Sequence, residues 1–213
     1  MGDLQVDAEV DAVLTTPLSP APGRGRPLSG GTQQAILGAA LDLLAERGLS
    51  DISVEDIAAR AGVSKASIYR RWPSKGTLAF DAFVVHFLDS QPTPDTGNLE
   101  DDLLITLGNW VRTVEGTTGR TLKGLIAEVQ RDPELAEAWR ERFVAVVRAR
   151  HLVMTERAMA RGELAPGANF DLLVDLLFGP GYHRLIHGHL PLDDRFLTGV
   201  VRAIMAAVKA DAF

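Results

Sequence analysis

Apolar side chains recur through most of this chain at the three- and four-residue spacing of an α-helix, and no stretch shows a convincing strand-like alternation. Glycine and proline interrupt the pattern and mark where the segments end. The sequence therefore predicts an all-α fold without internal repeats. We expect nine helices: two short ones between residues 53 and 72, and seven over about residues 32–47, 74–90, 99–115, 120–131, 133–161, 169–187 and 193–210.

The two short helices lie in the stretch SVEDIAARAGVSKASIYRRWPSKGTL, residues 53–78. Ser53 can cap the first helix, with Asp56 three residues on as its partner in a capping box. Gly62 tolerates the backbone geometry of a sharp turn, and Ser64 can cap the second helix. Two capped helices joined by a tight turn predict a helix-turn-helix.

The apolar residues around this motif predict one small core that continues into a second. The helix over residues 32–47 is amphipathic and is expected to end at Gly48. Ile68 and Trp72 fall four apart on one face, so we expect Trp72 to be a core aromatic. The helix over residues 74–90 starts at the possible cap Ser74 and is apolar nearly all round. A helix of that kind is buried on more than one side, so it should link the two cores.

The second short helix is basic, whereas the chain as a whole is acidic. Five lysines and arginines and no acidic residue fall between residues 60 and 75, although the formal net charge is −6. On charge alone, a solvated basic helix face is the favoured interpretation, because charge indicates partners only loosely. The turn, the caps and a tyrosine among arginines favour a phosphate-binding surface instead.

At these residues the chain resembles the TetR family of transcriptional regulators. The resemblance is strong from about residue 36 to residue 83 and elsewhere rests on helix pattern and length. It implies a DNA-binding domain followed by a larger helical domain for ligand binding and dimerisation, which we place at residues 29–75 and 76–213. The matching features are Ile57-Ala58, Ala61-Gly62-Val63-Ser64, Ile68-Tyr69, Trp72, Lys75 and Leu78.

A helix-turn-helix places the N-terminal part of its second helix at the base edges of double-stranded DNA. The candidates for base contact are Lys65, Ala66, Ser67 and Arg70. Matching positions in the family hold phosphates, which implies that role for Tyr69, Arg71 and Lys75. Free N–H groups at helix N-termini also favour anions, and these positions carry Ser53, Ser64 and Ser74. One departure from the family pattern is the Arg70-Arg71 pair, followed by Trp72-Pro73, because family members vary at these positions.

The resemblance also implies a small-molecule cavity in the C-terminal half, for an unidentified ligand. Every candidate for its wall recurs on an apolar helical face and is therefore first a core residue. Arg112 and Arg150 can orient an acidic ligand or can simply be solvated. The wall candidates are Phe83, Phe87, Trp110, Trp139, Phe143, Met154 and Phe178.

The last two helices suit the family's dimer interface, a four-helix bundle made of two helices from each subunit. Their apolar residues offer more surface than a lone hairpin would bury. Gly179-Pro180-Gly181 interrupts the first of them; the proline should kink the helix, and the glycines permit another backbone to approach. The alternative is a simple break between two shorter helices.

Residues 1–28 have the composition of a disordered arm with little apolar pattern. The arm ends in Arg24-Gly25-Arg26-Pro27, which resembles the core of an AT-hook that lays arginines in a narrow minor groove. An ordinary flexible tail is the favoured interpretation, with a minor-groove arm as the alternative.

Several classes of site find no support in the sequence. The chain has no cysteine, which excludes disulfides and thiolate metal sites. His183 and His187 lie four apart with His189 nearby, but no further ligands complete a metal site, so we expect neither a metal nor another cofactor. We find no motif of an enzyme, no secretion signal and no apolar run near the roughly 18 residues of a membrane span. We therefore expect a cytoplasmic protein that is not an enzyme.

Together these observations predict a homodimeric transcriptional regulator, a repressor that a small molecule releases from a roughly palindromic operator. One alternative is a regulator of the same fold without a ligand, which a well-filled core around Trp110 and Trp139 would favour. Another is an enzyme or carrier in which the helical domain is the active part.

Overall fold

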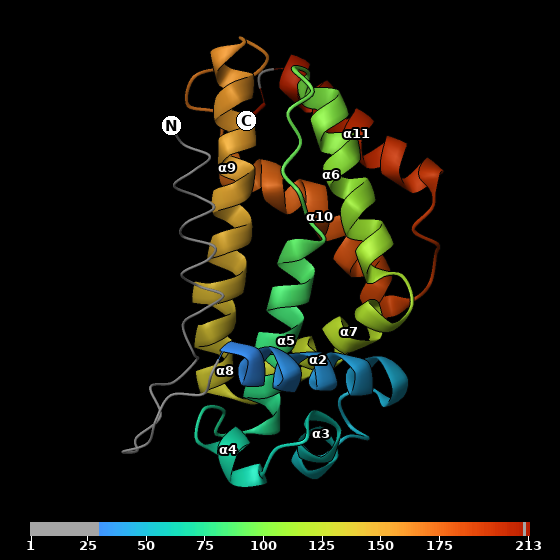
Figure 1. The fold of residues 1–213 in the computed structure, drawn as a ribbon. Coiled ribbons are helices and arrows are strands. Elements are labelled where there is room, and N and C mark those ends of the chain that lie inside the picture. Colours follow the sequence, from blue (N-terminus) through green and yellow to red (C-terminus); the bar gives the residue numbers. More distant parts are fainter. Residues whose placement is uncertain (1–29, 211) are drawn as a thin grey trace.

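The computed structural model describes residues 30–210 and 212–213, so the predicted arm and its Arg24-Gly25-Arg26-Pro27 segment lie outside the described residues. Within the described ranges the protein is helical without strands, as predicted (Figure 1). The elements are α2 (Gly30–Arg47), α3 (Val54–Ala61), α4 (Lys65–Tyr69), α5 (Lys75–Asp89), α6 (Leu99–Val114), α7 (Thr117–Val129), α8 (Pro133–Ala138), η1 (Trp139–Val144), α9 (Ala145–Ala160), α10 (Phe170–His187) and α11 (Asp194–Lys209).

Helices α2, α3 and α4 form a small unit at one end of the molecule, and their ends are where the sequence places them. The predicted capping box is confirmed: Asp56 N donates to Ser53 Oγ over 3.1 Å, and Ser53 N donates to Asp56 Oδ2 over 2.9 Å. Gly62 follows α3 in the left-handed conformation at φ 66°, and Ser64 caps α4. Trp72 is fully buried with Ile68, so its predicted place in the core is confirmed.

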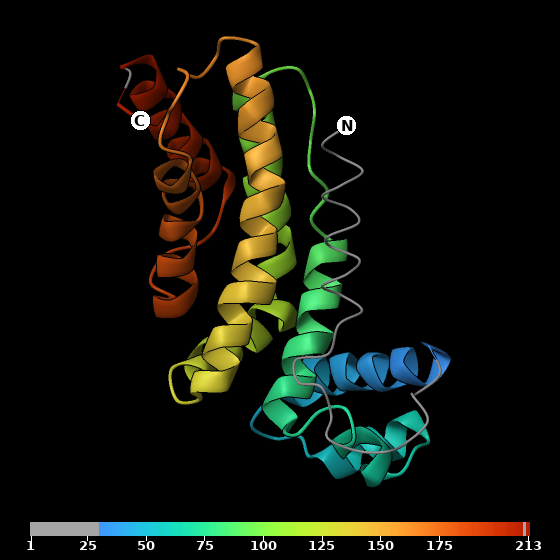
Figure 2. The same ribbon diagram turned by 90° about the vertical axis from the view of Figure 1, so that its left-hand side faces the viewer.

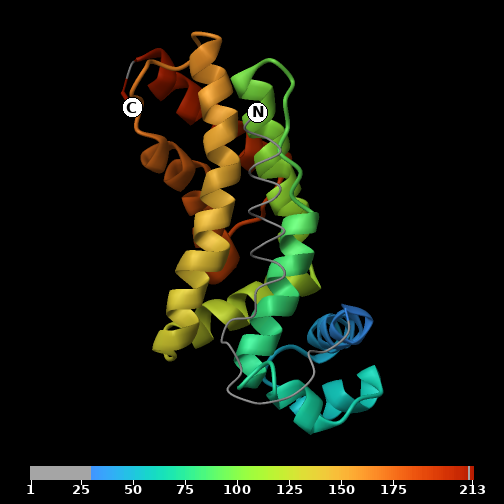
Figure 3. The same cartoon turned by 60° about the vertical axis from the view of Figure 1, so that its left-hand side comes forward.

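Helix α5 rises from this unit and packs against α2 and α7 (Figure 3). Ser74 caps it, and most of its residues are buried on every side. The prediction that this helix links the two cores is therefore confirmed. At its start Lys75 binds the small unit, and near its end Phe87 and Leu88 belong to the larger helical domain.

The predicted helix over residues 133–161 is continuous but not regular. It comprises α8, the π-helical turn η1 and α9, in which the π turn holds the sequence WRERFV. No proline or glycine marks this turn, so the sequence pattern gives no signal for it. Such π turns are rare and are frequent at functional sites.

Helix α10 runs unbroken through Pro180, so the alternative of two shorter helices is wrong. Gly181 permits a close approach, but the approaching group is an indole ring and not another backbone. A Cβ built at Gly181 would lie 2.6 Å from Cζ3 of Trp110, which is closer than real contacts allow. Helix α7 also differs from expectation, since it begins at Thr117 and not at Arg120.

Helices α10 and α11 lie side by side on one flank of the larger domain (Figure 2). Two large apolar side chains of α10, Leu172 and Leu176, stay exposed on this flank at 41% each. None of the helices in the described ranges combines the length and apolar character that crossing a membrane requires.

Candidate nucleic-acid interface and ligand cavity

Helix α4 presents its polar residues outward from the end of the small unit. Its N-cap Ser64 accepts a hydrogen bond from Ser67 N over 3.2 Å, and Ile68 anchors the helix in the core. The structure leaves four of the predicted DNA contacts exposed on this helix and just after it, and the Tyr69 side chain is 49% exposed. These four residues are Lys65, Ala66, Tyr69 and Arg70.

Two basic side chains at this end of the molecule, Lys65 and Arg60, are held by acidic partners that sequence reasoning missed. Lys65 Nζ lies 2.6 Å from Glu55 Oε1 on α3, and this hydrogen bond raises the pKa of Lys65. Arg60 forms two hydrogen bonds to the Glu46 carboxylate, of 2.6 and 2.9 Å. Both pairs are solvent-exposed, and exposed pairs are weak enough to exchange for phosphate.

Lys75 points into the protein, although it was predicted to hold a phosphate. Its Nζ donates to the carbonyl oxygens of Leu49 over 2.7 Å and of Ile52 over 2.9 Å. These bonds fix the start of α5 to the loop between α2 and α3. The phosphate contact of Lys75 stays a prediction, beside a structural role that the sequence did not indicate. The Ser53 hydroxyl is likewise used within its own cap, where it donates to Asp56 over 2.7 Å.

A buried polar cluster joins the small unit to the larger domain. Trp72, which follows α4, donates from Nε1 to Asp81 Oδ2 of α5 over 2.8 Å. Arg142 of η1 donates from Nη1 to the other oxygen, Asp81 Oδ1, also over 2.8 Å. Burial raises the pKa of Asp81, while Arg142 and the Trp72 N–H oppose that rise. The other predicted phosphate contact, Arg71, is half-buried, with its guanidinium 5.6 Å from the Trp72 ring.

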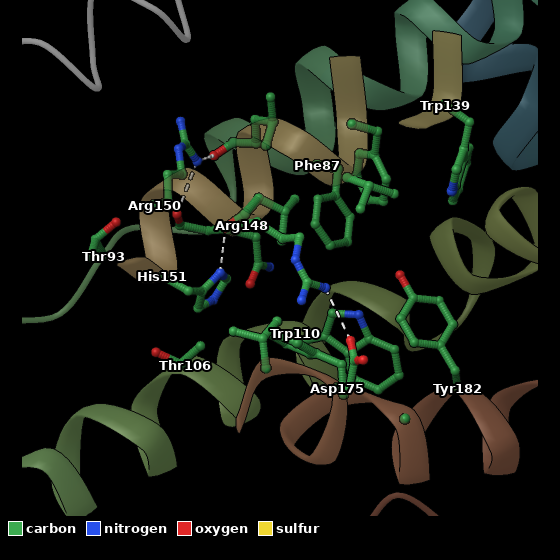
Figure 4. Close-up of a pocket in the computed structure, with 18 of the residues that line it drawn as sticks. Phe87, Thr93, Thr106, Trp110, Trp139, Arg148, Arg150, His151, Asp175 and Tyr182 are labelled. Carbon is green, nitrogen blue, oxygen red and sulfur yellow. Dashed lines mark hydrogen bonds and ion pairs between the residues drawn. The ribbon is translucent and has the colours of Figure 1, made fainter. Parts of the chain in front are cut away.

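A cavity of about 470 Å³ lies in the larger domain, bounded by α5, α6, η1, α9, α10 and the loop after α5 (Figure 4). Five of the seven predicted wall residues line it. The other two, Phe83 and Met154, are in the core behind the wall: Phe83 packs on the Phe87 and Phe143 rings, and Met154 accepts a weak hydrogen bond from Thr106 Oγ1. The residues on the wall are Phe87, Trp110, Trp139, Phe143 and Phe178.

The wall also carries polar groups that sequence reasoning missed, namely Thr106, Arg148, His151, Asp175 and Tyr182 (Figure 4). Arg148 of α9 donates to Asp175 over 3.0 Å and to Asp171 over 2.5 Å, both on α10. Burial lowers the pKa of His151 to about 4, so its ring is neutral near pH 7. Burial also raises the pKa of Tyr182 to about 12, which keeps its hydroxyl protonated.

The two arginines suggested as ligand-orienting groups occupy different places. Arg150 is on the cavity wall, where it donates to the carbonyl oxygens of Leu88 over 2.7 Å and of Gln91 over 3.2 Å. It thereby ties α9 to the end of α5. Arg112 lies away from the cavity and donates to Asn109 on its own helix.

His183, His187 and His189 gather near the end of α10. The ring centroid of His183 lies 4.7 Å from that of His187 and 5.0 Å from that of His189. Across the described part of the chain, no three or more histidines, cysteines and acidic residues are arranged to hold a metal ion.

Comparison with known proteins completes this description. The family model described as "Bacterial regulatory proteins, tetR family" matches residues 36–82, which span α3, α4, Trp72 and Asp81. The model described as "Tetracyclin repressor-like, C-terminal domain" matches residues 93–204, which span most of the cavity wall. The chain belongs to the TetR family.

Individual relatives agree with this assignment of the TetR-family chain. The HTH-type transcriptional regulator YdeS of Bacillus subtilis (strain 168) is 36% identical over 88% of this chain and 94% of its own. The DNA-binding transcriptional repressor TetR of Mycobacteroides abscessus is 32% identical over 80% of this chain and 90% of its own. The solved structure of the TetR family transcription regulator SCO0332 has a TM-score of 0.75 at 35% identity, covering 83% of this chain and 98% of that one. The protein is a DNA-binding transcriptional regulator.

Proposed function

We propose that this TetR-family regulator is a homodimeric repressor that a small molecule, bound in the cavity, releases from a palindromic operator. The observation that carries the proposal is that η1 belongs both to the cavity wall and to the buried cluster around Asp81. This one turn places Trp139 and Phe143 on the cavity wall and Arg142 on the buried Asp81. A ligand that displaces the wall therefore acts on the turn that holds the small unit.

The contacts proposed at the DNA follow from the exposed end of α4. Lys65 and Arg70 donate to base edges, where arginine or lysine can bind guanine O6 and N7. Ala66 and Ser67 lie beside them, with Ala66 limited to apolar contact. Tyr69 and Arg71 hold phosphates on either side, and helix N-termini at Ser53 and Ser64 add backbone N–H groups.

The dimer is proposed to form through α10 and α11, where large apolar residues stay exposed. Two copies would then present two α4 helices to successive major grooves, roughly 34 Å apart. A small change in that separation costs much affinity. In this scheme the dimer has two states, which differ in the separation of the two α4 helices. A ligand shifts the balance between these states only if its affinity for one exceeds its affinity for the other.

The main alternative is a TetR-family regulator without a ligand, and the open cavity around Trp110 and Trp139 counts against it. One relative bears the name of a DNA-binding transcriptional repressor, which supports the direction of regulation proposed here. The relatives described above are regulators and not enzymes, which leaves the enzyme or carrier alternative without support.

The test is selection of bound duplexes from a random DNA pool with the purified full-length protein, read by sequencing. A palindromic motif is expected, and no enrichment at low salt would contradict the proposal. The same selection with Arg70→Ala should lose preference at one base position, by about 1–3 kcal/mol. Uniform weakening of all sequences would instead make Arg70 a phosphate contact.

A further inference from the structure

Tyr182 of α10 offers the cavity a hydrogen-bond donor. Its ring packs on that of Trp110, with the centroids 5.2 Å apart, and the Trp110 N–H donates a hydrogen bond to its hydroxyl oxygen. That N–H is fully buried, so a ligand cannot reach it. An indole N–H only donates, so the hydroxyl oxygen accepts in this bond and the hydroxyl hydrogen is left for another partner. None of the residues that the structure describes accepts that hydrogen, and Tyr182 lines the cavity.

His151 of α9 offers the cavity a hydrogen-bond acceptor. Its Nδ1 lies 2.5 Å from the carbonyl oxygen of Val147. Burial lowers the pKa of His151 to about 4, so the ring is neutral near pH 7. A carbonyl only accepts, so Nδ1 carries the single proton of the neutral ring, and Nε2 has a lone pair. No residue in the described part of the chain donates to Nε2, and His151 is also on the cavity wall.

These two groups lie apart on the cavity wall. Figure 4 shows them on either side of Trp110, with His151 on α9 and Tyr182 on α10. Each is fixed by a partner within the protein, because Val147 sets the tautomer of the imidazole and Trp110 sets the direction of the hydroxyl. The Trp110 ring is itself held in place by Gly181, which leaves no room for a Cβ beside it. The rest of the wall is mainly apolar and aromatic, where a polar group without a partner is costly. A ligand therefore gains most from groups that match both.

We propose that the regulatory ligand has an apolar body with an oxygen acceptor at one end and a hydroxyl or N–H donor at the other. The acceptor takes the hydrogen of the Tyr182 hydroxyl, and the donor bonds Nε2 of His151. This inference rests on the proposed function, since it names the hydrogen-bonding pattern of the ligand for the same cavity. The cavity volume of about 470 Å³ lies within the range of sites for small molecules.

The test uses three naphthalene derivatives that differ in one group, titrated into the full-length protein by calorimetry. The reference is 6-acetyl-2-naphthol, whose ketone accepts and whose hydroxyl donates. Its methyl ether, 6-methoxy-2-acetonaphthone, has lost the donor, and 6-ethyl-2-naphthol has lost the ketone. The reference should bind about threefold to tenfold more tightly than each of the others, the worth of one hydrogen bond. Equal binding of all three would overturn the inference, as would failure of the reference to bind at about millimolar concentration.

Two variants connect each preference to its atom. His151→Leu should remove the advantage of 6-acetyl-2-naphthol over its methyl ether and keep its advantage over 6-ethyl-2-naphthol. Tyr182→Phe should do the reverse, since it removes only the hydroxyl. His86→Leu makes the same change as His151→Leu at an exposed position of α5 and should alter neither preference. Loss of both preferences in each variant would overturn the assignment of the two atoms. The comparison on the unaltered protein decides the hydrogen-bonding pattern even if a variant fails to fold.

Operator release is measured separately, with the selected DNA and 6-acetyl-2-naphthol. The expected preferences without release of the DNA would leave the hydrogen-bonding pattern intact and contradict the ligand-controlled repressor. Equal binding of the three compounds by a protein that still binds its operator would instead overturn the pattern alone.

Discussion

The DNA-binding end and the cavity half differ in what holds their elements in place. In the small unit, Ser53 and Asp56 form hydrogen bonds to each other, Lys65 pairs with Glu55, and the carbonyl oxygens of Leu49 and Ile52 accept from Lys75 of α5. The cavity half instead encloses a space of about 470 Å³, lined mainly by apolar and aromatic side chains. Polar pairs therefore fix the first region, whereas the second surrounds open space.

This difference assigns different mechanical roles to the two regions. A close-packed core moves as a rigid body when one of its helices is displaced. A core that contains a cavity can instead rearrange its side chains around a bound ligand. The Trp72–Asp81–Arg142 cluster lies where the two kinds of core meet. The following predictions test that contrast, from the largest expected effect to the smallest.

Asp81→Ala should lower the free energy of unfolding by about 3–5 kcal/mol, because it breaks a buried ion pair. Its carboxylate bonds both Trp72 and Arg142, so both regions should lose stability together in urea unfolding. Asp175→Ala removes a carboxylate from an exposed pair with Arg148 and should cost about 1 kcal/mol or less. Equal losses in the two variants would contradict the central place of Asp81.

Gly181→Ala should destabilise the protein by about 1–3 kcal/mol, because its Cβ would meet the Trp110 ring 2.6 Å away. Gly179→Ala lies two residues earlier on α10 with no atom within 4 Å of the added Cβ. That control should stabilise the protein by about 0.5–1 kcal/mol, as alanine does in a helix interior. Thermal unfolding distinguishes them, and a shift of both variants in the same direction would show that the indole can yield.

His151 should make stability depend on pH. Its folded pKa of about 4 lies below the ordinary 6.5, so between these values the unfolded chain binds the extra proton. Stability therefore falls as pH drops through this window, by about 2 kcal/mol between pH 7 and pH 4.5. Urea unfolding of His151→Gln should show a smaller loss of the free energy of unfolding over the same pH range. Parallel losses in the two proteins would mean that the site does not favour the neutral ring.

Glu55→Gln should tighten operator binding about twofold to fivefold, because an exposed pair is worth little and Lys65 would no longer exchange partners. Fluorescence anisotropy at fixed salt measures this change. Glu46→Gln removes the same charge beside Arg60 and serves as the control. If both variants tighten binding equally, the effect is one of net charge and Glu55 does not restrain Lys65 specifically.

Local sequence signals predicted the helices, their caps and the helix-turn-helix, because each depends on residues within one or two turns. Ser53, Gly62 and Ser64 behave as their residue types dictate. The partners of Lys75, Asp81 and Arg142 were not predicted, since 26 or 23 residues separate Lys75 from its acceptors and 61 separate Arg142 from Asp81. One signal was available for Asp81, which is an acidic residue within a helix that is apolar nearly all round.

Membership of the cavity wall was only partly predictable. Phe83 and Phe87 lie one turn apart on α5, and both are buried, yet only Phe87 reaches the cavity. Whether a buried side chain of α5 reaches the cavity depends on the distance between α5 and the neighbouring helices, which the sequence pattern does not give. Gly181 and Trp110 show the same limit, because 71 positions separate them in the chain while their contact sets the position of the indole.

The π turn η1 determines how the protein would respond to the deletion of a residue within it. A π turn holds about one residue more than an α-helical turn, and each residue of an α-helix advances the chain by about 100°. Deleting one residue between Trp139 and Val144 would restore a regular helix and rotate Arg142 relative to the residues on its other side. Arg142 could then no longer meet Asp81 while Trp139 and Phe143 both face the cavity. A single-codon deletion in this turn would therefore separate the Arg142–Asp81 pair from the cavity wall.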